Sequence, residues 1–96
     1  MRRAGRVDAN QPDIVRDLRQ CGCSVAITSA VGDGFVDIVV GFRGINVLLE
    51  IKDGDKPPSK RKLTPDEAVF HRAWKGQVAV VKNFDEAWAV VASAQK

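Results

Sequence analysis

Residues 35–52 read FVDIVVGFRGINVLLEIK, and this stretch decides the fold. Two apolar runs, 35–41 and 45–52, flank a short connection around Arg43-Gly44 that is typical of a tight hairpin. Runs with so few polar residues are typical of central strands that are covered on both faces. The stretch therefore predicts two antiparallel neighbours in the middle of a sheet.

Three charged residues, Asp37, Glu50 and Lys52, interrupt these runs. If Arg43 and Gly44 are the turn residues, Asp37 falls opposite Glu50 with Cβ atoms about 5 Å apart. Lys52 follows Glu50 by two residues and points to the same face. Lys52 could bridge the two acids as an ion pair, or the acids could hold Mg²⁺ or Mn²⁺, which prefer oxygen ligands. Buried ion pairs seldom repay their desolvation, so the pattern favours a metal site.

A third carboxylate could come from the helix that Asn10 is expected to cap and Gly22 to end. Asp13 and Asp17 are the candidates, and the pattern does not decide which of them points inward. Both also have simpler interpretations. Asp13 lies in the first turn, where an acid stabilises the helix dipole, and Asp17 would then be a solvated surface residue.

The rest of the chain supplies an α/β fold with a mixed sheet. Thr64, Pro65 and Glu67 form a capping-box pattern that begins a second helix. The fourth strand follows that helix, so a parallel pairing is expected. The element order is α-β-β-β-α-β-α. The predicted helices span residues 10–21, 64–75 and 85–94, and the predicted strands span residues 24–30, 35–41, 45–52 and 77–82.

Composition limits the possible functions. The chain has 96 residues and a net charge of +3, which is enough for one domain and permits a nucleic-acid partner. We expect a flexible basic arm over residues 1–9 and a single domain over residues 10–96. No apolar run approaches the roughly 20 residues that span a bilayer, and no signal-peptide pattern follows the start, so we expect a cytoplasmic protein without a membrane partner.

Basic residues gather in two places, in the loop after the third strand and at the N-terminus. Such runs are often only solvated surface. Beside acids that hold a metal, however, they are typical of sites that bind and cleave phosphodiesters. The candidate DNA-binding residues are Lys56, Lys60, Arg61, Lys62, Arg2, Arg3 and Arg6.

The cysteines and the single histidine give weaker signals. Cys21 and Cys23 are too close in sequence for an unstrained disulfide, so we expect two reduced thiols. His71 is the only other soft metal ligand in the chain, which is too few for a zinc site. It is either a helix-surface residue or a contact to phosphate or substrate.

The ordered set of motifs resembles the VRR-NUC nucleases of the PD-(D/E)XK superfamily, in particular the small stand-alone members from phages and bacteria. The resemblance rests on the segments DANQPDIV (8–15), GFVDIVVG (34–41), LLEIKDG (48–54), KPPS (56–59) and LTPDE (63–67). Three positions depart from the family pattern. Val36 stands where proline is common, Asp13 where glutamate is common, and Glu67 where glutamine is common.

The resemblance implies a restriction-endonuclease-like core and a metal-dependent DNA endonuclease that is similar to Holliday-junction resolvases. Asp37 and Glu50 would hold one or two Mg²⁺ or Mn²⁺ ions together with the Ile51 carbonyl. Lys52 would orient or deprotonate the attacking water, or stabilise a phosphate oxygen. Asp13 would act through water, and Glu67 would either do the same or serve only as the helix cap.

The expected substrate is branched or four-way-junction DNA, which a two-fold homodimer with two sites would suit. The bound protein would read the backbone and the shape of the DNA and not its sequence. The main alternative is a nuclease-fold module that binds DNA without cleaving it. A small interaction domain with incidental charges and a phosphoesterase acting on nucleotides are the remaining alternatives.

Overall fold

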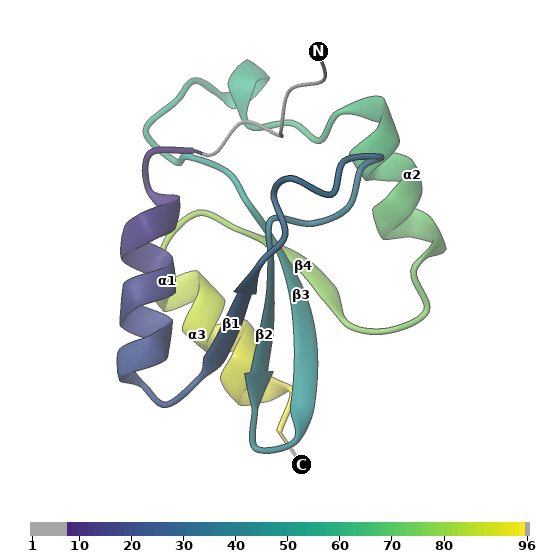
Figure 1. Cartoon of the computed structure of the whole chain (residues 1–96). Helices are drawn as coiled ribbons and strands as arrows, with labels where there is room; N and C mark the ends of the chain where they lie inside the picture. The colour runs from purple at the N-terminus through teal and green to yellow at the C-terminus, as the bar shows by residue number, and fades with distance from the viewer. Residues whose placement is uncertain (1–7, 96) are drawn as a thin grey trace.

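A four-stranded mixed sheet in the order β1-β2-β3-β4 forms the centre of the protein (Figure 1). The computed structural model describes residues 8–95. Its elements are α1 (Gln11–Gln20), β1 (Ser24–Ile27), β2 (Ile38–Phe42), β3 (Ile45–Ile51), η1 (Pro58–Lys60), α2 (Pro65–Ala73), β4 (Val78–Val81) and α3 (Phe84–Ser93). The predicted fold class and the predicted order of helices and strands are confirmed, with one short 3₁₀ helix, η1, added in the basic loop.

The hairpin between β2 and β3 has the predicted register. Phe42 pairs with Ile45, and the ladder runs back to the pair of Ile38 with Leu49. Arg43 and Gly44 have φ angles of 53° and 81°, as both central residues of a type I′ turn require. Strand β4 pairs with β3 in parallel, also as predicted. Each strand of the central pair therefore has hydrogen-bonded neighbours on both sides.

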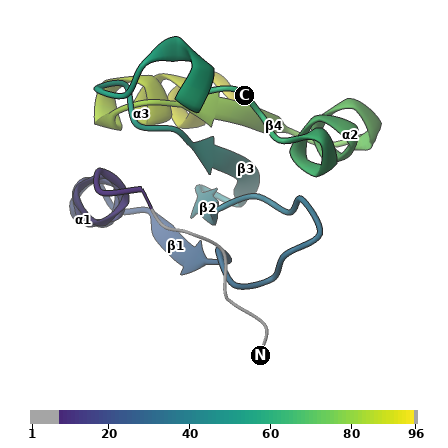
Figure 2. The same ribbon diagram turned by 90° about the horizontal axis from the view of Figure 1, so that it is seen from above.

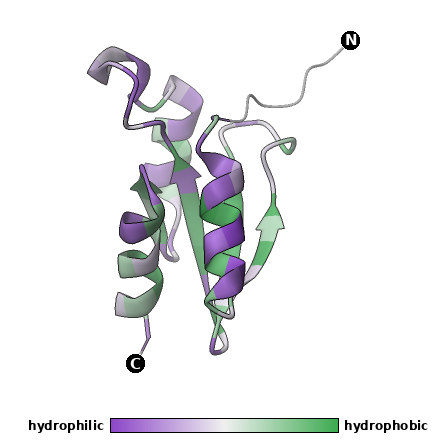
Figure 3. Ribbon diagram, turned by 90° about the vertical axis from the view of Figure 1, so that its left-hand side faces the viewer, coloured by the Kyte–Doolittle hydropathy of each residue, from purple (hydrophilic) through white to green (hydrophobic). Residues whose placement is uncertain are grey.

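Helices α1 and α3 cover one face of the sheet, and α2 lies beyond the other face (Figure 2). Helix α1 is amphipathic, and Figure 3 shows hydrophilic and hydrophobic residues alternating along it. Its apolar side joins inward-facing residues of the strands and of α3 in a single core. The core includes Ile14, Val15, Leu18, Ile38, Val40, Val47, Leu49, Ile51, Val81, Ala87 and Val91.

The segment between β1 and β2 differs from the prediction. Strand β1 ends at Ile27 and not at residue 30, and β2 begins at Ile38 and not at residue 35. Gly32, Asp33 and Gly34 all have positive φ angles, so the chain turns out of the sheet. Gly34 then passes so close to α2 that a Cβ atom there would lie 2.5 Å from the Asp66 carbonyl oxygen. Contact with α2 therefore sets where the strands end.

The two predicted N-caps have different outcomes. The Thr64 hydroxyl accepts from the Glu67 amide at 3.2 Å and Glu67 accepts from the Thr64 amide at 2.9 Å, so the capping box is confirmed. Asn10 stands at the N-cap of α1, but its side chain makes no cap hydrogen bond. Its amide donates instead to the carbonyls of Lys52 and Lys82, which end two strand segments.

The helices are all short. Over residues 8–95, none is long and apolar enough to cross a membrane. Helix α2 also differs from the other two α-helices in having no buried residue.

Candidate functional site

A cleft of about 770 Å³ opens where β3 ends. Its walls come from the end of β3, the residue before β2, the basic loop, the start of α2 and the segment before α1. The lining residues are Asp8, Asp37, Glu50, Ile51, Lys52, Lys56, Pro57, Ser59, Lys60, Lys62, Thr64 and Glu67. Most of the residues singled out from the sequence therefore meet in one cleft.

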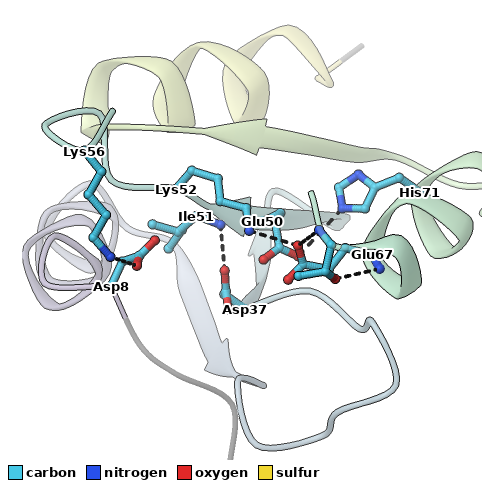
Figure 4. A network of polar contacts seen from close by, with 9 residues as sticks. Asp8, Asp37, Glu50, Ile51, Lys52, Lys56, Glu67 and His71 are labelled. Carbon is cyan, nitrogen blue, oxygen red and sulfur yellow. Dashed lines mark hydrogen bonds and ion pairs between the residues drawn. The ribbon is translucent and has the colours of Figure 1, made fainter. Parts of the chain in front are cut away.

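Asp37 is held where the β2–β3 ladder ends. If β2 continued past Ile38, the Ile51 amide would lie opposite Val36. It donates instead to Asp37 Oδ2 at 2.7 Å (Figure 4). The carboxylate thus takes the place of a backbone acceptor and is fixed beside the open end of the ladder. Burial raises the pKa of Asp37, against the hydrogen bonding with Glu50 and Ile51.

Glu50 is 2% exposed, and it is the most buried charged residue among those described. Burial comes first among the causes that raise the pKa of Glu50 to about 10, followed by the neighbouring Asp37 and Glu67, while Lys52 opposes the rise. Glu50 Oε1 is buried without a hydrogen-bond partner. Glu50 and Asp37 therefore favour a shared proton when no further cation is near, and a dication could displace that proton.

Lys52 Nζ donates to Glu67 Oε1 at 2.9 Å, and both side chains are largely buried. Burial acts to lower the pKa of Lys52, but the hydrogen bond to Glu67 and the charges of the three acids outweigh it and raise the pKa. Burial likewise acts to raise the pKa of Glu67, but the hydrogen bonds from Lys52 and Thr64 outweigh it and lower the pKa. Lys52 is therefore an ammonium group and Glu67 a carboxylate, and Glu67 serves as cap and site residue together.

His71 belongs to the site, although the sequence left its place open. Its Nε2 lies 3.7 Å from Glu50 Oε1, and its side chain is 12% exposed. Burial lowers the pKa of His71. Its spacing from Glu67 was the available signal, because residues four apart share one face of a helix. With Glu67 on the sheet side, His71 follows one turn later.

Asp13 is not among the residues that the cleft brings together. Its side chain is 72% exposed and pairs with Arg16, which also pairs with Asp17. Both acids lie outside the cleft because α1 turns Ile14 and Leu18 into the core. The acid that reaches the cleft from this part of the chain is Asp8, which pairs with Lys56 at 3.0 Å.

The basic residues are placed unevenly. Lys56, Lys60 and Lys62 line the cleft. Arg61 belongs to the same loop but does not line the cleft, and its buried Nε has no hydrogen-bond partner. Arg2, Arg3 and Arg6 of the predicted arm lie outside the described residues.

The donor set at the cleft fits a hard dication. Asp37 and Glu50 supply carboxylate oxygens, one of them without a partner. The N–H and C=O of a strand residue point to the same edge, so the Ile51 carbonyl lies on the Asp37 side, as its amide does. Within residues 8–95, no three acidic, histidine or cysteine side chains are already arranged around one point as ligands. The Glu67 carboxylate is engaged by Lys52, so Asp37, Glu50 and the Ile51 carbonyl are the oxygen ligands proposed at the end of β3.

A second hollow, of about 610 Å³, lies between α1 and β1. Its lining is Gln11, Pro12, Val15, Arg16, Arg19, Gln20 and Ile27, which is mainly apolar and includes no acid. Of the two, the larger cleft at the end of β3 is the one lined by both acids and lysines.

Comparison of the chain with models of protein families, with curated proteins and with solved structures finds no match. The function is therefore inferred from the arrangement of the chain's own side chains.

Proposed function

We propose that this chain is a metal-dependent DNA endonuclease that hydrolyses phosphodiester bonds. The observation that carries the proposal is the facing pair of the half-buried Asp37 and the buried Glu50, at the base of a cleft with a lysine rim, where Lys52 is the nearby lysine among the described residues. Burying two facing acids disfavours their charged forms unless a cation joins them. Mg²⁺ or Mn²⁺ is the class of cation that carboxylate and carbonyl oxygens select.

Asp37, Glu50 and the Ile51 carbonyl would hold the ion. Its bond to the Ile51 amide pre-orients Asp37, and Glu50 has a free oxygen to offer. When bound, such an ion activates water and stabilises the charge that develops on the phosphate. The proposed site therefore needs little rearrangement of its two carboxylates.

Lys52 is proposed to donate to a phosphate oxygen at the cleavage position. Its ammonium group already donates to a carboxylate oxygen of Glu67, and a phosphate oxygen could take the place of that acceptor. Glu67 keeps the ammonium next to the acid pair until the phosphate arrives. Lys56, Lys60 and Lys62 would contact backbone phosphates further along the cleft.

The finer points of the proposal concern the substrate and its setting. Because the lysines contact backbone and not bases, the selection would depend on DNA shape, with branched or four-way-junction DNA as the class of substrate. A two-fold homodimer would match the symmetry of such a junction. A DNA substrate of this kind would place the protein in the cytoplasm of a bacterium or of a phage-infected cell.

A second candidate is a nuclease-fold module that binds DNA without cleaving it. The observation that favours it is the ion pair between Lys52 and Glu67, since a glutamate there competes with the phosphate for Lys52. Glu67→Gln separates the two candidates, because glutamine keeps a hydrogen-bond acceptor but removes the competing charge. A module that gains cleavage with this change would be an attenuated enzyme.

Cleavage of labelled duplex, flap and four-way-junction DNA tests the proposal, each with Mg²⁺, Mn²⁺ or EDTA. We expect metal-dependent cleavage by the wild type and none by Glu50→Gln. Asp13→Asn is the matched control, because it removes an exposed carboxylate that does not line the cleft. Equal cleavage by Glu50→Gln and wild type would refute the assignment. DNA binding without cleavage under every condition would favour the second candidate.

A further inference from the structure

An aromatic row at the C-terminal end of α2 is not used by the cleavage site; it consists of Phe35, Phe70 and the C-cap residue Trp74. Phe35 contacts the ring of Phe70 edge-on, with centroids 5.2 Å apart and an interplanar angle of 75°. Trp74 stacks on Phe70 at 5.0 Å and 26°. The indole also lies against the chain at Gly76, where a Cβ atom would be 2.9 Å from Trp74 Nε1. Trp74 is thus supported on one side, yet it is 41% exposed.

The exposed indole comes one helical turn after His71, the residue that reaches the acid pair. His71 reaches Glu50, and Trp74 follows His71 by three residues, which is about 5 Å along a helix axis. The lysine rim is at the other end of α2, where Lys62 precedes the helix. The nine residues of α2 span about 13 Å, so along this helix Glu67 and His71 lie between the lysine rim and the indole.

The charge around the indole favours a polyanion. Residues 68–81 contain two cations, Arg72 and Lys75, and no acidic residue. Arg72 and Lys75 are exposed and flank Trp74 in the chain. An exposed aromatic ring with nearby cations is the combination that single-stranded nucleic acids bind, because every base offers a flat face and every link a phosphate.

We propose that Trp74, backed by Phe70, stacks an unpaired base of a DNA strand that leaves the duplex beside the cleavage site. The duplex part lies along the lysine rim and the unpaired part crosses α2. The substrates selected are then branched molecules with unpaired nucleotides next to the cut, in preference to blunt duplex. The consequence for cleavage rests on the proposed nuclease function, whereas the binding of the base does not.

The test uses tryptophan fluorescence in EDTA, where no DNA is cut. Trp88→Phe leaves Trp74 as the only reporter, and Trp74→Phe leaves the half-buried Trp88 as the control. We expect an oligo-dT strand and a flapped duplex to quench the emission of Trp74 saturably, and the emission of Trp88 to change little. Blunt duplex of equal length should quench Trp74 much less.

Affinity measurements complete the test. Trp74→Ala should weaken binding of the oligo-dT strand and the flap by about fivefold to 100-fold, as loss of one stacked base does. Trp74→Phe should restore most of the affinity, and binding of blunt duplex should stay unchanged in both variants. Circular dichroism establishes that each variant is folded, and Val69→Ala supplies a control at an exposed apolar position within α2.

Three results would overturn the proposal: no quenching of Trp74 by unpaired DNA, unchanged affinity of Trp74→Ala for the flap, or an equal loss for blunt duplex. Cleavage assays keep the two proposals apart. If Trp74→Ala cuts flap and duplex as the wild type does, the nuclease stands and base stacking fails. If the wild type cuts nothing but Trp74→Ala still loses flap binding, base stacking stands without the nuclease.

Discussion

The two faces of the sheet are held together by different forces. On one face, α1 and α3 bury apolar side chains such as Leu18 and Val91, both at most 1% exposed. On the other face, α2 buries none of its residues fully and is attached by the Lys52–Glu67 ion pair, the His71–Glu50 contact and the Phe35–Phe70 contact. The first face stabilises the fold, and the second leaves polar groups available for chemistry.

The largest expected effect comes from removing Lys52, the lysine that pairs with Glu67 of α2 on the second face. Lys52→Ala should lower the cleavage rate by about 100-fold to 10,000-fold, the range typical of a group that assists proton transfer or phosphate charge. DNA affinity in EDTA should change little, because the rim lysines remain. Lys82→Ala, which removes an exposed lysine paired with Glu86, is the control. Cleavage by Lys52→Ala at the wild-type rate would refute the proposed role of Lys52 in cleavage.

The next prediction compares how much the α1–α3 face and helix α2 each contribute to the free energy of unfolding. Leu18→Ala should lower the free energy of unfolding by about 2–5 kcal/mol, because it leaves a cavity in the core. Val69→Ala on α2 should change it by less than about 0.5 kcal/mol, since Val69 is 55% exposed. Urea unfolding of the two variants measures the difference. Similar losses would show that α2 contributes to the core as α1 does.

A smaller effect separates the lysine rim from the arginines of α1. The double change Lys60→Ala with Lys62→Ala should make the slope of log affinity against log salt less negative by about 2, one unit per phosphate contact. Arg16→Ala with Arg19→Ala removes equal charge from the other hollow and should leave the slope nearly unchanged. Binding titrations of a labelled duplex at several salt concentrations give both slopes. Equal changes would mean that net charge alone attracts DNA.

The last effect is a pH dependence of stability without metal. Folding raises the pKa of Glu50 from about 4.5 to about 10, so the protonated form is favoured in the folded state. The stabilising contribution is complete at low pH and is lost as pH rises toward the folded pKa. Between pH 7 and 9 the free energy of unfolding in EDTA should fall, by at most about 1.4 kcal/mol per pH unit for one proton.

Glu50→Gln is the control for this dependence, because its amide does not titrate. Thermal unfolding of both proteins across the range, with and without Mn²⁺, measures the effect. Mn²⁺ should stabilise the wild type more at pH 9 than at pH 7, since fewer protons then compete for the carboxylates. A wild-type stability that rises with pH in EDTA would contradict the shared-proton description of Asp37 and Glu50.

Local pattern predicted the part of the site that the hairpin carries. Two residues with positive φ, Arg43 and Gly44, fix the register, and the register alone places Asp37 opposite Glu50. The capping box of α2 was predicted in the same way, because its contacts lie within four residues. These features depend on neighbours in the chain, where a sequence pattern is informative.

The parts of the fold and site that the sequence did not predict depend on contacts between distant segments. Asp8 lies before α1, where no periodic pattern exists, and its position depends on contact with Lys56, 48 residues away. Asp13 was chosen because an acid on the first helix fitted the family pattern, but the apolar side of α1 turns it outward. The ends of β1 and β2 depend on how the Gly32–Gly34 turn packs on α2, which their own residues do not reveal.

The contacts of Asn10 indicate the order in which the parts of the cleft form during folding. Its side-chain amide joins the carbonyls of Lys52 and Lys82, which are 42 and 72 residues away. Closing a long loop costs more conformational entropy than closing a short one, and long-range contacts therefore form more slowly. The β2–β3 hairpin closes over only two residues. The hairpin that carries Asp37 and Glu50 can therefore form early, but the wall that Asn10 secures has to wait until β4 has joined the sheet. During folding the acid pair comes before its enclosure, so a chain that is still folding carries both acids before the cleft around them is complete.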